Sequence, residues 1–219
     1  MTRVKICGNM IPADARLAYD LGADYLGLIF AESKRRLTVG QAKLIMDAVP
    51  DFSNFVGVFC NQPKQEVLVT VEELGIKILQ FHGDETALYC ESFQKRGCHV
   101  IKTFRIKDAM SIKRINDYDV DHFLFDTYKK GEHGGTGLMF DWNFIEDYPH
   151  VHEKLFLAGG LSVKNLASAI AKVGPYAVDV SSGVEQSVGK KDPALLEEFI
   201  MIAKGSSHVG KGSIHTETP

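Results

Sequence analysis

Short apolar runs recur along the whole chain, and each is four or five residues long with few polar interruptions. Strands covered on both faces of a parallel sheet have this pattern, because neither of their faces meets water. The runs predict eight strands, at residues 4–7, 25–29, 55–59, 76–80, 100–103, 122–125, 155–158 and 177–180.

Helical periodicity fills the intervals between these runs. Ala13, Leu17 and Leu21 lie four residues apart, which places them on one face of a helix. The weakest helical pattern is the sixth, at residues 142–148, which is short and is expected to end before Pro149. Strands and helices therefore alternate from one end of the chain to the other.

Eight strands alternating with helices predict an α/β fold, a single (β/α)8 TIM barrel over residues 1–204. A doubly wound open sheet is the alternative, but it normally uses five or six strands. Its G-x-G-x-x-G fingerprint is absent after the first apolar run, where Cys7, Gly8 and Asn9 stand instead. Residues 205–219 are rich in Gly, Ser and Thr and lack apolar periodicity, so we expect a flexible tail.

Composition narrows the class of protein. The chain has 219 residues, 45% of them hydrophobic, and a net charge of −3, which suits one large core. It contains no block of five or six like charges, no apolar run of membrane-spanning length and no signal-like apolar start. We therefore expect a cytoplasmic protein that binds neither nucleic acid nor membrane. A monomer is the default expectation, and a homodimer remains open.

Neither the cysteines nor the histidines have the spacing of metal ligands, so no metal is expected. The four cysteines are expected to be free thiols, as is usual in a cytosolic chain. They are Cys7, Cys60, Cys90 and Cys98.

Small residues follow the last two predicted strands. Gly159 and Gly160 come after the seventh, and Ser181, Ser182 and Gly183 come after the eighth. In a (β/α)8 barrel, backbone N–H groups at these two positions commonly bind a phosphate, and glycine allows close approach. One glycine pair alone is as consistent with an ordinary turn as with a phosphate site, but two such loops together favour the phosphate site.

A proton donor and a proton acceptor are expected at the same end of the barrel. Cys7 and Asp126 end the first and sixth strands and can face the barrel mouth from different sides. A carboxylic acid and a thiolate can act as general acid and general base. A free thiol has a pKa near 8.5, so a nearby cation has to favour the thiolate, and Lys5 is a candidate two residues below Cys7.

Taken singly, these residues have structural interpretations. Cys7 could be a core thiol and Asp126 a turn cap, and only their pairing beside a phosphate site favours catalysis. Of the adjacent Arg35 and Arg36, one can fork onto a carboxylate while the other is solvated. His82, which follows the fourth strand, is as consistent with a structural role as with substrate binding.

An ordered series of motifs resembles the phosphoribosylanthranilate isomerase family over about residues 3–203. The opening Lys-Ile-Cys-Gly at residues 5–8 and the late Asp-Val-Ser-Ser-Gly-Val-Glu at residues 179–185 are the most specific. The other motifs occupy residues 33–35, 57–61, 80–83, 125–127, 134–137, 140–142, 157–161 and 189–192. The departures from the family pattern, at Lys34, Cys60 and Phe81, remove no functional group.

The resemblance implies an Amadori rearrangement of N-(5-phosphoribosyl)anthranilate to 1-(2-carboxyphenylamino)-1-deoxyribulose 5-phosphate. It implies Asp126 as general acid, Cys7 as general base and Arg35 as partner of the anthranilate carboxylate. It also implies Asp179 on the anthranilate side of the substrate, with His82 as a further substrate-binding candidate. The phosphate would lie against Gly159, Gly160, Ser181, Ser182 and Gly183. No cofactor is implied, because the substrate nitrogen serves as the electron sink.

Two alternatives remain. A phosphosugar isomerase of histidine biosynthesis, or a bifunctional form, resembles this chain at the phosphate site but typically places aspartate where Cys7 stands, and it shows half-barrel symmetry that is absent here. A non-catalytic barrel that binds a phosphorylated ligand would keep the phosphate loops, but would have no reason to keep Cys7 and Asp126 at different strand ends.

Overall fold

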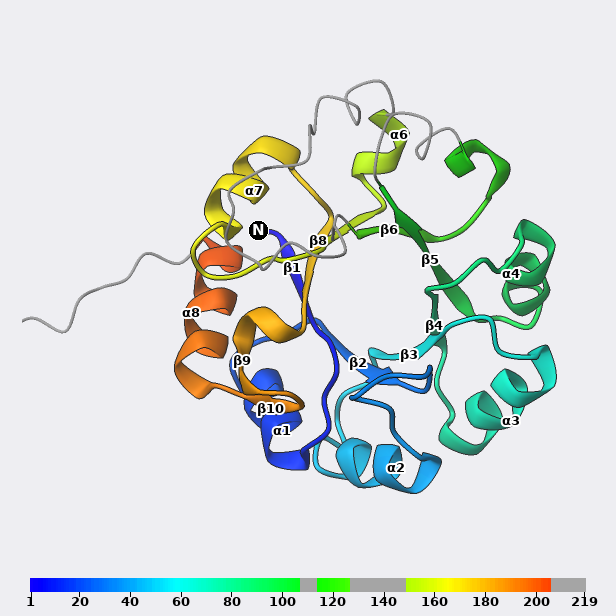
Figure 1. Cartoon of the computed structure of the whole chain (residues 1–219), viewed down its shortest axis with the longest axis horizontal. Coiled ribbons are helices and arrows are strands. Elements are labelled where there is room, and N and C mark those ends of the chain that lie inside the picture. Colours follow the sequence, from blue (N-terminus) through cyan, green and yellow to red (C-terminus); the bar gives the residue numbers. More distant parts are fainter. Residues whose placement is uncertain (107–113, 127–148, 206–219) are drawn as a thin grey trace, which may run out of the picture.

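A computed structural model describes residues 1–106, 114–126 and 149–205 of the chain. Eight parallel strands pair in sequence order, and the eighth closes onto the first to form a barrel. Figure 1 looks along this barrel, with the helices arranged around the strands. The strands are β1 (Arg3–Ile6), β2 (Tyr25–Ile29), β3 (Phe55–Phe59), β4 (Ile78–Phe81), β5 (His99–Arg105), β6 (His122–Asp126), β7 (Leu155–Ala158) and β8 (Ala177–Val180).

Helices follow most of the strands and cover the outside of the barrel (Figure 1). Those that the structure describes are α1 (Pro12–Asp20), α2 (Val39–Asp47), α3 (Lys64–Leu74), α4 (Ala87–Gln94), α6 (Pro149–His152), α7 (Leu166–Val173) and α8 (Pro193–Lys204). Two 3-10 helices, η1 (Arg114–Asp117) and η3 (Ser182–Val184), and a small hairpin of β9 (Glu185–Ser187) and β10 (Lys190–Lys191) complete the described chain.

Alternation along the strands produces two apolar layers. The larger layer lies between strands and helices and includes Val4, Ile6 and Leu26. The smaller layer fills the inside of the barrel with residues such as Val58 and Phe156. Because side chains on a strand alternate between faces, the residues that end the inward rows point toward the barrel mouth.

The eight predicted strands and the single barrel are confirmed, with strand ends shifted by no more than two residues. The sixth helix was expected at residues 142–148, which lie outside the described residues, as do residues 134–137 and 206–219. The structure does show a short helix that the sequence did not predict, α6 at Pro149–His152. Proline is well suited to the first turn of a helix, where its missing N–H costs no hydrogen bond.

Candidate active site

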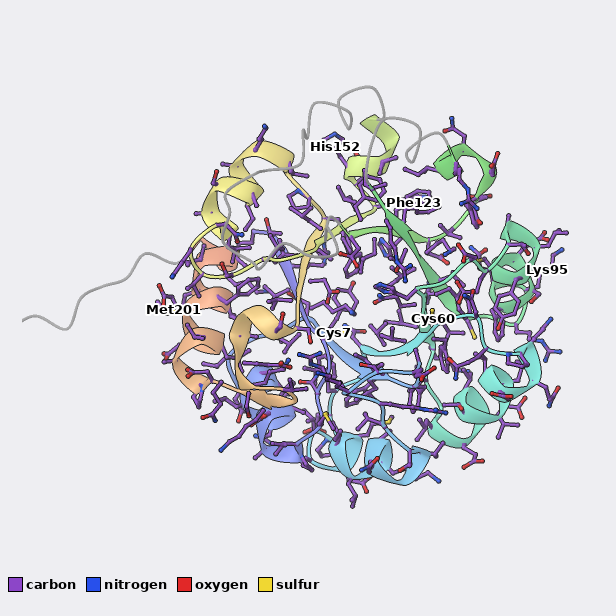
Figure 2. All side chains as sticks on the ribbon, in the orientation of Figure 1. Cys7, Cys60, Lys95, Phe123, His152 and Met201 are labelled. Carbon is purple, nitrogen blue, oxygen red and sulfur yellow. The ribbon has the colours of Figure 1, made fainter. Side chains whose placement is uncertain are left out.

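A cavity of about 260 Å³ opens at the C-terminal ends of the strands. All the residues that the sequence singled out for a site line it, and they come from separate parts of the chain: Cys7, Arg35, His82, Asp126, Gly159, Gly160, Asp179, Ser181, Ser182 and Gly183. Figure 2 places Cys7 near the centre of the ring of strands, whereas Lys95 and Met201 lie at its periphery. The fold therefore brings together in one cavity residues that lie up to 176 positions apart in the sequence, from Cys7 to Gly183.

The loops after β7 and β8 form one wall of the cavity. Gly159 and Gly160 both have positive φ, 89° and 71°, so the chain turns sharply there. A side-chain carbon on Gly183 would collide with the carbonyl oxygen of Leu161, so glycine lets the two loops approach each other. The buried hydroxyl of Ser181 has no hydrogen-bond partner among the described residues. This wall can offer backbone N–H groups and a hydroxyl to an anion.

Cys7 lies above a buried ion pair inside the barrel. Lys5 of β1 is in register with Asp179 of β8, and its Nζ donates to Asp179 Oδ1 at 2.9 Å. Burial alone would lower the pKa of Lys5, but Asp179 and Cys7 outweigh it and raise that pKa. Burial raises the pKa of the Cys7 thiol, although Lys5 and Lys191 act in the opposite direction. The expected cation therefore lies near Cys7, but burial outweighs it and favours the thiol form of Cys7.

Arg35 reaches the cavity from the loop after β2 and forks onto Glu185. Its Nε and Nη2 donate to the two carboxylate oxygens at 2.8 and 2.5 Å. Burial alone would raise the pKa of Glu185, but the hydrogen bonds from Arg35 and Lys191 lower it, so the carboxylate is ionised. The sequence predicted such a fork for a ligand's carboxylate, whereas in the structure a carboxylate of the protein, that of Glu185, occupies one side of the guanidinium.

Asp126, at the end of β6, and His82, directly after β4, are neighbours in the wall of the cavity. His82 Nε2 lies 3.4 Å from Asp126 Oδ2. On the other side of the ring, Gln80 Nε2 donates to His82 Nδ1 at 3.0 Å and to Thr103 Oγ1 at 3.3 Å. Since Nδ1 accepts, the ring hydrogen is on Nε2 and points toward the carboxylate. The imidazole of His82 is thus oriented by Gln80, and it can donate to Asp126.

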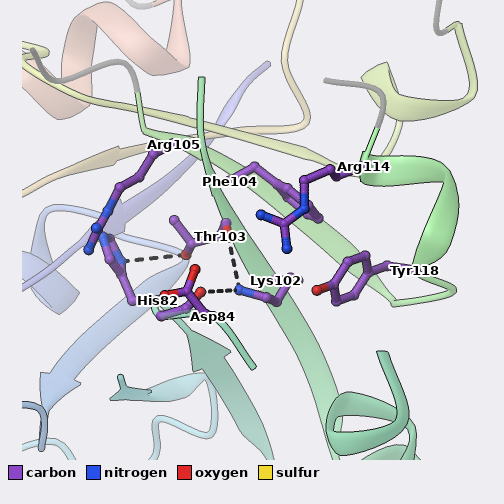
Figure 3. Close-up of a pocket in the computed structure, with 9 residues that line it drawn as sticks. His82, Asp84, Lys102, Thr103, Phe104, Arg105, Arg114 and Tyr118 are labelled. Carbon is purple, nitrogen blue, oxygen red and sulfur yellow. Dashed lines mark hydrogen bonds between the residues drawn. The ribbon is translucent and has the colours of Figure 1, made fainter. Parts of the chain in front are cut away.

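A second cavity of about 300 Å³ adjoins the first and shares His82 with it. Figure 3 shows Lys102 beneath Thr103, with Arg105 and Arg114 on either side of the opening. Lys102 is held by four oxygens, of which the nearest is the Gly83 carbonyl at 2.7 Å. Its ammonium is therefore engaged in the protein, and the arginines are the cations that face the opening.

Three residues of the site were not assigned from the sequence. Gln80 orients His82, Glu185 holds Arg35, and Lys191 binds Glu185 from below. Glu185 and Lys191 stand within the motifs that carry the family resemblance, but no spacing rule links them to Arg35. The one signal that the sequence offered was Glu185, a charged residue shortly after the small-residue loop at residues 181–183.

Two properties concern the described residues alone. No three His, Cys, Asp or Glu side chains come close enough together there to hold a metal ion. None of the helices in this part of the chain combines the length and the apolar character that a membrane span requires. The cysteines Cys7, Cys60, Cys90 and Cys98 are all free thiols, as expected.

A closed barrel of eight parallel strands, with helices between them and a cavity at the C-terminal ends of the strands, defines the class of (β/α)8-barrel proteins. The model of one family within this class, described as N-(5'phosphoribosyl)anthranilate (PRA) isomerase, matches residues 4–201. The chain belongs to that family.

Individual relatives agree over nearly the whole length. The chain is 43% identical over 205 residues to N-(5'-phosphoribosyl)anthranilate isomerase of Pelobacter propionicus, covering 93% of this chain and 96% of the relative. It is 44% identical over 206 residues to the Geobacter sulfurreducens protein of the same name, covering 94% and 100%. Phosphoribosyl anthranilate isomerase from Thermotoga maritima, a crystal structure, has a TM-score of 0.83 and 37% identity over 94% of this chain and 100% of its own.

A further crystal structure shows a member of the family in complex with reduced 1-(o-carboxyphenylamino)-1-deoxyribulose 5-phosphate. It has a TM-score of 0.80 and is 34% identical, covering 94% of this chain and 100% of that chain.

Proposed function

We propose that this protein is a phosphoribosylanthranilate isomerase, which converts N-(5'-phosphoribosyl)anthranilate into 1-(2-carboxyphenylamino)-1-deoxyribulose 5-phosphate. The observation that carries the proposal is the single cavity that Cys7, Asp126, Arg35 and the two phosphate loops line together. Membership of the family supports the choice of substrate, since relatives more than 40% identical over nearly the full chain carry this activity in their names.

The phosphate and the carboxylate of the substrate are bound by different residues of the cavity. The phosphate lies against Gly159, Gly160 and the loop at residues 181–183, where backbone N–H groups and the Ser181 hydroxyl donate. The anthranilate carboxylate lies against Arg35, whose Nη1 is not engaged by Glu185. Asp179 lies on the anthranilate side. No cofactor or metal enters the reaction.

The chemistry requires one proton donor and one proton acceptor. Protonated Asp126 gives its proton to the ring oxygen as the C1–O bond of the furanose breaks, which leaves an iminium at C1. The Cys7 thiolate then removes the proton from C2, and the electron pair of that C–H bond moves toward the iminium nitrogen. The enolamine that results tautomerises to the ketone. The hydrogen on His82 Nε2 points at Asp126 and stabilises the carboxylate that remains.

The test follows the loss of substrate fluorescence with freshly made phosphoribosylanthranilate. Cys7→Ala and Asp126→Asn are each expected to lower kcat/KM by at least about 10²-fold, because each removes one proton-transfer group. Cys60→Ala and Asp117→Asn are the matched controls, since neither side chain lines the cavity. An inactive wild type would refute the substrate, and full activity in either cavity variant would refute the acid–base assignment.

We further propose that the protein acts in the cytoplasm as a monomer on a small phosphorylated substrate, with no nucleic-acid or membrane partner. A homodimer is the alternative, since a dimeric phosphoribosylanthranilate isomerase from Thermotoga maritima is among the related structures. Large exposed apolar residues are scattered over different elements, such as Leu44 on α2 and Leu88 on α4. Size-exclusion chromatography with light scattering gives the mass directly, and a mass near twice 24.2 kDa would refute the monomer.

A further inference from the structure

We propose that Lys191 is a positioning residue of this site, which holds the main chain of Cys7 and the guanidinium of Arg35 in place at the same time. The inference rests on the proposed function, because it concerns the general base and the carboxylate-binding residue of that reaction. Lys191 lies on β10, outside the barrel strands, and no motif argument assigns it a role.

The ammonium of Lys191 joins three segments of the chain. Its Nζ lies 2.7 Å from the carbonyl oxygen of Cys7, 3.2 Å from that of Ser181 and 3.1 Å from Glu185 Oε1. A protonated lysine has three N–H donors, and each finds one acceptor here. The side chain is only 1% exposed, so water does not compete for these bonds. One residue thus fixes the end of β1, the phosphate loop and the start of β9.

The link continues from Glu185 to Arg35. Glu185 Oε1 accepts from both Lys191 and Arg35 Nε, while Oε2 accepts from Arg35 Nη2. The guanidinium is therefore gripped on one side, and its opposite side is left for a ligand. Because a guanidinium is planar, fixing Nε and Nη2 also fixes the direction in which Nη1 points. Lys191 acts on Arg35 through the carboxylate of Glu185.

The backbone around Lys191 is anchored independently of its side chain. Its N–H donates to Asp14 Oδ2 on α1 at 2.8 Å. The next residue, Asp192, donates to the Val184 carbonyl at 2.9 Å, and its carboxylate caps the first turn of α8. Figure 1 shows the β9–β10 hairpin beside α1 and β1. These hydrogen bonds fix the main chain that carries the Lys191 ammonium, as accurate positioning of reacting groups requires.

Stability alone is a weak reason for a charge at this position. Transferring an ammonium from water to the protein interior costs several kcal/mol, and an apolar side chain of similar volume often replaces a buried ion pair without loss. Burial accordingly lowers the pKa of Lys191, although Glu185 opposes that shift. A methionine would fill the same space without this cost, but it could not orient the Cys7 carbonyl or Glu185.

Steady-state kinetics of Lys191→Met are the first test. We expect kcat to fall because Cys7 is no longer held, and KM to rise because Arg35 is released, with kcat/KM lowered by up to roughly 10²-fold. Lys190→Met is the matched control, since Lys190 is the exposed neighbour on the same strand. Glu185→Gln keeps the size of the side chain and should raise KM with less effect on kcat. If Lys191→Met does not fold, this variant still tests whether Glu185 positions Arg35.

A second measurement is independent of turnover. The alkylation rate of Cys7 by iodoacetamide, followed against pH by mass spectrometry of its peptide, reports the thiolate directly. Lys191 favours the thiolate of Cys7, so its loss should shift the alkylation profile to higher pH. Lys190→Met should not shift it.

These two measurements separate the two proposals. A shifted profile in a protein that does not turn over phosphoribosylanthranilate would support the role of Lys191 at Cys7 and refute the substrate. A folded Lys191→Met protein with wild-type kcat, KM and alkylation profile, and only a lower melting temperature, would show that Lys191 is merely structural. A wild-type KM in Glu185→Gln would likewise overturn the claim that Lys191 acts on Arg35 through Glu185.

Discussion

Cys7 fits into a space that a neighbouring glycine leaves open. A side-chain carbon on Gly27 of β2 would lie 2.7 Å from Cys7 Sγ, well inside contact distance. We expect Gly27→Ala to displace the sulfur and lower kcat, by up to roughly 10²-fold for a shift near 1 Å. Gly40→Ala in α2 is the control, because nothing lies within 4 Å of a carbon placed there. Stopped-flow turnover at saturating substrate measures the effect, and an unchanged kcat would contradict the tight fit.

The raised pKa of Cys7 makes a prediction about pH. Burial disfavours the thiolate, and the thiolate is the form that the proposed reaction uses. We therefore expect the alkylation of Cys7 by iodoacetamide in the wild type, which depends on the thiolate alone, to go on accelerating with pH beyond about 8.5, the ordinary pKa of a free thiol. Alkylation rates between pH 6 and pH 10 measure this, and a rate that is already level at about pH 8.5 would contradict the raised pKa of Cys7.

The raised pKa of Cys7 also makes the free energy of unfolding depend on pH. A thiol whose pKa is higher in the folded than in the unfolded protein contributes fully below the unfolded pKa, and the contribution is lost as pH rises through the folded pKa. The difference in unfolding free energy between wild type and Cys7→Ala should therefore shrink above about pH 8.5. Urea titrations of both proteins at pH 7 and pH 10 test this, and a difference that grows with pH would reverse the assigned sign.

Single residues show where sequence reasoning stops. The places of Cys7 and Asp126 at the cavity could be predicted, because each ends an apolar run and the strand ends of a parallel barrel meet. The contacts of Gly27 and Lys191 could not be predicted, because they depend on which atoms lie opposite across a strand pair or a hairpin. The fork of Arg35 was predicted from its chemistry, but its partner Glu185 became visible only in three dimensions.

At the scale of elements, strands were easier to predict than the segments between them. A strand that is buried on both faces has an apolar run in its sequence, and each of the eight apolar runs forms a strand of the barrel. The β9–β10 hairpin is polar, and its strands have only three and two residues, so it leaves no such pattern. The helix at Pro149–His152 was missed because proline was taken as a stop, although it also begins helices.

The loops after β7 and β8 depend on each other through Gly183. Its missing side chain lets the chain pass against the Leu161 carbonyl, which cannot move without shifting the loop after β7. We expect Gly183→Ala to separate the loops, raise KM through weaker phosphate binding and destabilise the fold by about 1–3 kcal/mol, as overpacking does. Gly40→Ala, in a helix with free space, should leave KM unchanged. Equal KM values in the two variants would refute the coupling.

At the scale of the whole molecule, the two ends of the described chain close the barrel together. β1 pairs with β8 over four residues, and Thr2 N–H donates to the Ala203 carbonyl of α8. Lys204 at the end of α8 donates to Asp24 Oδ2 at 2.6 Å, and the same oxygen accepts from the Val4 N–H at 2.7 Å. The last helix therefore fastens the first strand, a relation that no local sequence pattern contains.

Truncation from the C-terminus distinguishes this closing helix from the stretch that follows it. Leu196, Phe199 and Ile200 of α8 are buried, and truncating a single buried phenylalanine to alanine typically costs about 3–5 kcal/mol. Loss of all of α8 would exceed the usual stability of a domain of roughly 5–15 kcal/mol. We expect a chain ending at Asp192 to be unfolded by circular dichroism, and one ending at Gly205, where α8 is capped, to keep its melting temperature and kcat. A cooperative melt in the shorter chain would mean that the barrel closes without its last helix, and lost activity in the longer one would give residues 206–219 a role that their sequence does not predict.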